Sequence, residues 1–237
     1  MRRRVIGVVV IGLLFGVAAC SESVEVKDAE QMSEALLGVD DLEGAWTKNV
    51  GSPGPDEEKL PESGILSDKQ REVMPTLDMC DAAPTEAKEA ADTLKWAVFR
   101  QIDKTVDDPL DPPTDRSGHM VFVQESMISD EPDVLSETFD ALVLGSEACL
   151  GEIPAGEEGP GSSAKVTIED VGDQQIAVLT EIEEAGGTGM WHIYTAIVRK
   201  GSVLVSLMAA DVVLGDLPSE LQLDDFDRIV QTALGKL

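Results

Sequence analysis

Histidine, tyrosine and cationic side chains are scarce in this chain of 237 residues. The two histidines, His119 and His192, show neither HxxxH nor HExxH spacing, so a zinc site has little support. No Gly-x-Ser-x-Gly segment occurs, which argues against the nucleophile elbow of an α/β-hydrolase. Only 18 lysines and arginines accompany 46 aspartates and glutamates, a net charge of −28. Nucleic acid is therefore not an expected partner, because its phosphates would meet like charge.

A hydrophobic run long enough to cross a membrane is also missing. Val5–Val17 is apolar and uncharged, but a hydrocarbon core needs about 20 such residues. Arg2, Arg3 and Arg4 precede this run, and the order predicts a signal peptide with a basic n-region and a short h-region. The following Val17-Ala18-Ala19-Cys20 resembles the bacterial lipobox, which implies cleavage before Cys20 and a diacylglycerol thioether on Cys20. An ordinary secretory signal with Ala-x-Ala-like cleavage is the alternative.

Cysteine parity predicts one disulfide. With Cys20 set aside for the lipid, Cys80 and Cys149 remain, an even pair in an oxidising compartment. Two free buried thiols are the alternative. A bond between them would close a loop of about 70 residues and stabilise the fold by roughly 4 kcal/mol in the chain-entropy model.

The chain divides into three predicted parts. Residues 1–19 are a signal peptide, 20–31 are the lipidated cysteine and a polar tether, and 32–237 are a single extracellular domain. The acidic body would be repelled by an anionic membrane, so the lipid on Cys20 has to provide the anchor. We expect a monomer with no cofactor and no metal, held on the outer face of the cytoplasmic membrane.

The pattern of the domain predicts an α+β fold, a mostly antiparallel sheet with helices packed on one face. Alternating apolar residues indicate strands at 94–104, 120–127, 165–171, 175–183, 191–199 and 203–210. The last four strands read as a meander, with tight turns such as Lys200-Gly201. Helical spacing and caps indicate helices at 32–37, 85–91, from Pro132 to just before Cys149, and 219–237.

Two loops invite a ligand-binding reading. Asp107, Asp108, Asp111 and Asp115 offer carboxylates of the kind that calcium prefers, but the EF-hand order is absent and a solvated acidic loop is expected. The turn at Gly186–Gly189 lacks the lysine and the helix of a phosphate-binding loop, so a flexible hairpin turn is expected there.

The large aromatic side chains with a polar atom are few. Alternation places Trp191 and Ile193 on one face of a strand and His192 and Tyr194 on the other, so one pair could lie in the core and the other in a groove, with core packing as the favoured role. The full set is Trp46, Trp96, Trp191 and Tyr194.

The chain is similar to actinobacterial lipoproteins related to the extracellular sensor domain of PknH-type receptor kinases. The resemblance rests on the lipobox, on a cysteine ahead of the first strand, on Cys149 after the middle helix, and on the segment 194–205 with the terminal helix. It implies a compact, disulfide-bonded α+β domain outside the cell with a ligand groove, and it brings no catalytic residues. Two departures stand out: the sensor domain has two disulfides, and this chain has neither a kinase domain nor a transmembrane helix.

Three functions remain open from the sequence. The first is a non-enzymatic, sensor-like or ligand-binding surface lipoprotein for a small-molecule or envelope ligand, whose binding residues are unknown; it predicts an apolar pocket between sheet and helices. The second is an acidic envelope protein that meets a basic partner through a flat face. The third is a hydrolase, which requires a serine within hydrogen-bonding reach of His119 or His192.

Overall fold

The computed structural model describes residues 25–49, 59–74, 77, 79–104, 118–154, 159–184, 189–214 and 218–237. The predicted signal peptide and Cys20 lie outside these residues, as do the aspartates of the 107–115 loop and residues 186–188 of the glycine-rich turn. Among the helices in the described part, none is both long and apolar enough to span a membrane.

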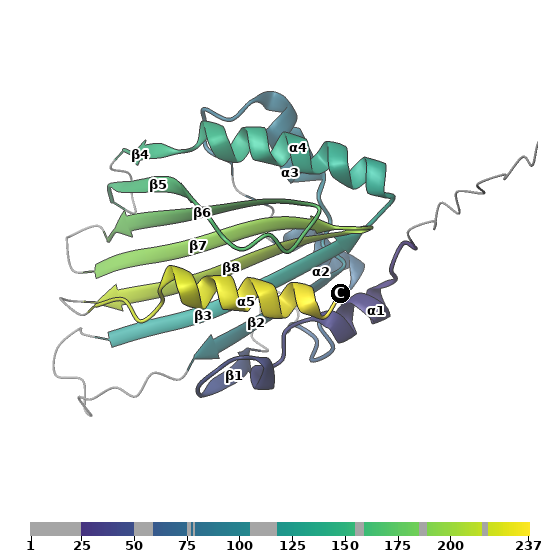
Figure 1. Ribbon diagram of the computed structural model, residues 1–237, viewed down its shortest axis with the longest axis horizontal. Coiled ribbons are helices and arrows are strands. Elements are labelled where there is room, and N and C mark those ends of the chain that lie inside the picture. The colour runs from purple at the N-terminus through teal and green to yellow at the C-terminus, as the bar shows by residue number, and fades with distance from the viewer. Residues whose placement is uncertain are drawn as a thin grey trace, which may run out of the picture.

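One antiparallel sheet of eight strands organises the described fold, in the spatial order β1-β2-β3-β8-β7-β6-β5-β4 (Figure 1). The last four strands pair in sequence order, so the predicted meander is confirmed, but its first strand lies at Gly161–Val166 rather than at the predicted 165–171. β3 pairs with β8 along its whole length, which joins the early and late parts of the chain in one sheet. The strands are β1 (Trp46–Asn49), β2 (Val98–Lys104), β3 (Gly118–Ser129), β4 (Gly151–Ile153), β5 (Gly161–Val166), β6 (Gln174–Glu183), β7 (Gly189–Lys200) and β8 (Val203–Leu214).

The predicted helices are present, with changed ends. Pro132 opens the middle helix and Cys149 caps its end, as the sequence indicated. The final helix begins at Leu223 rather than Ser219, because a buried side chain of β8, Asp211, holds the preceding residues in a turn. α2 and β4 were not predicted. The helical elements are α1 (Ala29–Ala35), the 3₁₀ turn η1 (Val39–Asp41), α2 (Asp68–Val73), α3 (Thr85–Thr93), α4 (Pro132–Ala148) and α5 (Leu223–Gly235).

Helices cover both faces of the sheet, so the α+β class is confirmed but the placement of all helices on one face is wrong. α1 and α5 pack on Val203 and Val205, whereas α3 and α4 pack on Leu204 between them. Successive residues of a strand point to opposite faces. The continuous buried run Val203–Val205 therefore requires cover on both sides. In Figure 1, α5 lies across the near face of the sheet.

The folded domain starts earlier than the predicted boundary at Met32. The carbonyl oxygen of Glu25 accepts a hydrogen bond from Ser202, and the Lys27 amide donates to the Ser129 hydroxyl at 2.8 Å. Asp28 then caps α1 through a capping box. Residues 25–31 are thus fastened to the folded domain, although they were predicted to be part of the polar tether.

Candidate functional site

A cleft of about 340 Å³ lies between the start of α5 and the segment that links α1 to β1. We refer to residues 36–45 as the α1–β1 segment. Val121 of β3, Leu221 of the turn before α5 and Ile229 of α5 form an apolar floor, and all three are buried. Leu42 and Trp46 stand on the opposite wall. The volume is at the small end of the range of about 300 to 1,000 Å³ that is usual for ligand sites.

The α1–β1 segment is held in place by hydrogen bonds at the end of α1. Glu125 of β3 accepts the Leu37 amide hydrogen with 2.6 Å between nitrogen and oxygen. Lys236, just after α5, donates to the Leu36 carbonyl oxygen at 2.8 Å and to the Asp41 carboxylate. Lys236 thus binds two acceptors of the α1–β1 segment and fixes this wall of the cleft at both points.

Glu125 is an unusual residue for the middle of a sheet, because its side chain is almost completely buried. Burial raises the pKa of this carboxyl to about 7, although the Leu37 amide and the nearby cations Arg100 and Lys236 pull it down. Arg100, its neighbour across the strands, donates to the carbonyl oxygens of Leu36 and Leu37. Burial lowers the pKa of Arg100, and the attraction of Glu125 opposes this effect. The two strands therefore present a guanidinium and a buried carboxyl to the end of α1.

The α5 wall is anchored by a second buried carboxylate. Asp211 of β8 is fully buried and accepts hydrogen bonds from the Ser219 hydroxyl at 2.8 Å and from the Glu220 amide at 2.6 Å. These contacts fix the turn that precedes α5 and carries Glu220 and Leu221 to the cleft. Each wall of the cleft is thus positioned by a buried side chain of the sheet, Glu125 for the α1–β1 segment and Asp211 for the turn before α5.

Ion pairs surround the mouth of the cleft. Lys104 contacts Glu220 with 2.9 Å between nitrogen and oxygen. Arg228 of α5 pairs with Asp225 on its own helix and with Glu43 across the cleft at 3.4 Å. Pairs as exposed as these contribute only about 0 to 1 kcal/mol to stability. Their main consequence is to orient polar groups around the apolar floor.

Trp46 contributes an aromatic ring to the cleft lining, and its N–H group is already hydrogen-bonded within the protein. Its indole nitrogen already donates to the Glu43 carbonyl oxygen at 2.8 Å, and the side chain is half-buried. An aromatic ring in this position can stack on the apolar face of a ligand. The site therefore combines an aromatic wall, an apolar floor and a charged rim.

Two other hollows are less suited to hold a ligand. One, of about 750 Å³, lies at the β4–β7 edge and includes Glu152, Pro154 and Met190. The other is a polar depression on the first turns of α5, around Asp224 and Asp227. Neither contains a tryptophan, whereas the cleft at Trp46 joins polar groups to a buried apolar floor.

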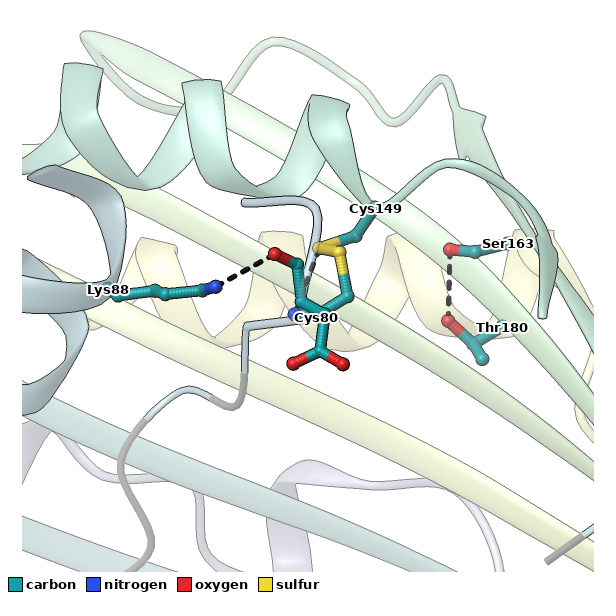
Figure 2. Close-up of a disulfide and its surroundings, with 6 residues drawn as sticks. Cys80, Lys88, Cys149, Ser163 and Thr180 are labelled. Atoms are coloured by element: carbon teal, nitrogen blue, oxygen red, sulfur yellow. Dashed lines mark hydrogen bonds between the residues drawn. A yellow bond between two sulfur atoms is a disulfide. The ribbon is translucent and has the colours of Figure 1, made fainter. Parts of the chain in front are cut away.

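The predicted disulfide joins Cys80 and Cys149, with their Cα atoms 5.6 Å apart (Figure 2). It links the segment before α3 to the end of α4, and the Cys80 amide also approaches the Cys149 sulfur at 3.1 Å. Lys88 of α3 donates to the Asp81 carbonyl oxygen at 2.9 Å, which closes the same corner. The bond therefore fastens two helices to each other on the face opposite α5, away from the cleft.

The histidines do not form a site in the described part. The Nδ1 atom of His192 lies 3.1 Å from the Glu181 carboxylate on the neighbouring strand β6. His119 belongs to β3, which β8 separates from β7, and its side chain is outside the described residues. Within the described ranges, no three histidine, cysteine or acidic side chains are placed to hold a metal ion.

The remaining aromatic residues divide between core and surface. Trp96 and Tyr194 are buried, and Tyr194 stacks on Phe226 of α5 with ring centroids 5.3 Å apart. Core packing was predicted for all four large aromatic residues, and it is confirmed for Trp96 and Tyr194. Trp191, on the opposite face, is half-buried.

Sequence reasoning missed the residues that build the cleft. Glu125 and Asp211 look like ordinary polar positions in their strands, and no local pattern shows that a distant segment will cover them. Trp46 was expected in the core. A weak signal exists in the terminal helix, where Asp225 and Arg228 follow three residues apart and can pair on one face.

No known protein family matches this chain, and a search of curated proteins found no match. Among solved structures, the chain is similar to the Rv0999 ortholog of Mycobacterium smegmatis, with 14% identity, a TM-score of 0.40, and coverage of 88% of this chain and 96% of that one. LpqN of Mycobacterium tuberculosis, described as involved in cell envelope biogenesis, has 14% identity and a TM-score of 0.27, with 82% and 88% covered.

The human StarD13 lipid transfer and protein localization domain has 8% identity and a TM-score of 0.25, over 58% of this chain and 81% of that domain. Two of these three structures are mycobacterial proteins. The identities and TM-scores are too low to carry an argument, and the function has to be argued from the site itself.

Proposed function

We propose that this protein is a lipid-anchored, non-enzymatic envelope protein that binds a ligand in the cleft between the α1–β1 segment and α5. The observation that carries the proposal is the half-buried ring of Trp46 above the buried floor of Val121 and Ile229. Ligand sites commonly combine such an apolar lining with a few oriented polar groups. The resemblance to lipoproteins related to the PknH-type sensor domain points in the same direction and remains part of the proposal.

The cleft is better suited to binding than to catalysis. Its described lining contains no histidine, cysteine or serine, and neither Thr232 nor Lys104 has a histidine beside it in this lining to act as a general base. The pKa of its Asp41 carboxyl is lowered, since Lys236 and the Gly38 amide favour the charged form more strongly than burial opposes it. A carboxylate held ionised in this way is a hydrogen-bond acceptor and a poor general base.

Replacement of the lipid attachment site tests the anchor. In cells that process lipoproteins, the Cys20→Ser protein should be released from the membrane or remain uncleaved, because no thiol is left to carry the diacylglycerol. Fractionation with metabolic fatty-acid labelling measures this, and Cys80→Ser serves as the control that should stay labelled. A Cys20→Ser protein that still incorporates labelled lipid would overturn the anchor.

Ligand binding is tested with envelope extracts from the producing cells. Full-length protein in a detergent without sugar groups should gain thermal stability when the extract contains the ligand, by mass action on the folded state. The Trp46→Ala protein should show a much smaller gain, because the aromatic wall is lost. Trp191→Ala removes a tryptophan on the other face of the sheet and should respond like the parent protein.

The extract experiment has two informative outcomes. Stabilisation of the parent and of Trp191→Ala, but not of Trp46→Ala, would place a ligand in the cleft. Equal stabilisation of all three proteins would show that the ligand binds elsewhere and would rule out the cleft as the functional site.

A further inference from the structure

The rim of the cleft presents donors and acceptors side by side. Lys104 and Arg228 have three and five N–H donors, more than their ion pairs with rim carboxylates engage. Glu220, Asp225 and Glu43 supply carboxylate oxygens next to these donors. A ligand that both donates and accepts can therefore bind without breaking a pair.

Charged ligands fit this rim poorly. Four carboxylates and two cations line the cleft, a formal charge of −2 in a chain of net charge −28. An anion would be repelled by this field, and to form a full ion pair with either cation it would have to displace Glu220 or Asp225. A cation would have to displace Lys104 or Arg228, which already occupy the carboxylates. Either exchange gains little, because it replaces one ion pair by another.

A hydroxyl group does not have to displace either partner of an ion pair, because it is uncharged and offers one donor and two acceptors at once. A ring that carries several hydroxyls can therefore donate to a carboxylate and accept from the paired cation in the same place. The C–H face of such a ring is apolar and can lie against Trp46 and Leu42. The Trp46 N–H already donates to the Glu43 carbonyl oxygen, so the indole offers the ligand its apolar face. The buried floor at Ile229 provides a second apolar contact.

We propose that the cleft binds a neutral, polyhydroxylated ring, namely a saccharide unit, with the ring stacked on Trp46 and its hydroxyls shared between the Lys104–Glu220 and Arg228–Asp225 pairs. This inference rests on the proposed function and names its ligand class. The cleft of about 340 Å³ limits the bound part to a small unit rather than a long chain.

The test uses saturation-transfer NMR and intrinsic fluorescence on the full-length protein in a zwitterionic, sugar-free detergent. The probes are the methyl glycosides of glucose, galactose, mannose and N-acetylglucosamine, with putrescine and inorganic phosphate as charged probes. We expect at least one glycoside to bind, and its affinity to change little with salt, because the ligand is uncharged. Trp46→Ala should weaken this binding by about tenfold or more, whereas Trp191→Ala should not.

A substitution on the rim separates hydrogen bonding from charge. Glu220→Gln keeps an acceptor of the same shape but removes the negative charge. Glycoside binding should survive it with a change of only about threefold. For a cationic ligand the same change should cause a large loss, and this loss should grow as the salt concentration falls.

The outcomes distinguish the saccharide from the general proposal. If putrescine or phosphate binds in a salt-dependent, Trp46-dependent way and no glycoside binds, the ligand class is wrong while the cleft remains a binding site. If no probe binds but the envelope extract stabilises the parent and not Trp46→Ala, the cleft is again a binding site and the saccharide is again the wrong ligand class. Glycoside binding that is equal in the parent and Trp46→Ala proteins would overturn both.

Discussion

A protein in which Cys80 and Cys149 are both replaced by alanine is expected to unfold with a free energy about 4 kcal/mol below that of the parent. The bond spans 69 positions of sequence and joins the segment before α3 to the end of α4. Without it, the unfolded chain regains the freedom that the closed loop removes. Equilibrium denaturation of both proteins measures the difference.

Reduction provides a matched control for this prediction. The parent protein in dithiothreitol should unfold at the same denaturant concentration as the double alanine variant, and the reductant should not change the variant. Both proteins should keep the ligand response of the cleft under mild conditions, because the disulfide lies on the other face of the sheet from α5. A parent protein whose unfolding midpoint does not move on reduction would contradict the stabilising role of the bond.

The second large effect is a pH dependence that originates at Glu125. Burial raises the pKa of this carboxyl from 4.5 to about 7, so the folded protein holds the proton more tightly than the unfolded chain does. The stability contributed by this group is therefore fully present below pH 4.5 and is lost as the pH rises through 7. The loss amounts to roughly 3 kcal/mol, because one pKa unit corresponds to about 1.4 kcal/mol.

Glu125→Gln isolates this contribution from that of the many other carboxylates. The amide oxygen can still accept the Leu37 hydrogen, but the group no longer titrates. The stability of the variant relative to the parent should therefore rise by roughly 3 kcal/mol between pH 5 and pH 8. Urea denaturation across this range, at constant ionic strength, measures the difference.

Ser126→Ala is the control for Glu125→Gln. It changes a neighbouring buried position of β3 without removing a titrating group, so it should displace the stability curve and leave its slope unchanged. Parent and Glu125→Gln curves that run parallel from pH 5 to pH 8 would show that the buried carboxyl does not titrate in this range.

Much of the fold is readable from local patterns. The alternation in 175–183 and 191–199 located β6 and β7, because successive residues of a strand point to opposite faces of the sheet. The spacing after Pro132 located α4 in the same way. Cysteine parity identified the disulfide, because only Cys80 and Cys149 remain once Cys20 is assigned to the lipid.

The errors have a common cause in long-range contacts. The run Val203–Val205 shows that β8 is buried, but not that two different sets of helices cover it. β4 was missed because three residues carry no measurable period, and only pairing with β5 makes them a strand. α5 starts late because Asp211, at the buried end of β8, accepts hydrogen bonds from Ser219 and Glu220 and holds them in a turn, a contact that helical spacing does not reveal.

The sequence by itself determined the cysteine pair, the acidity and the order of the main strands and helices, since each depends on neighbouring residues or on composition, and it predicts a signal peptide and a lipobox. Only the tertiary structure decided the site. Trp46 and Arg228 are far apart in the chain and meet at one cleft because Glu125 and Asp211 hold the two walls from the sheet. Such contacts arise from packing of distant segments, which no local period encodes.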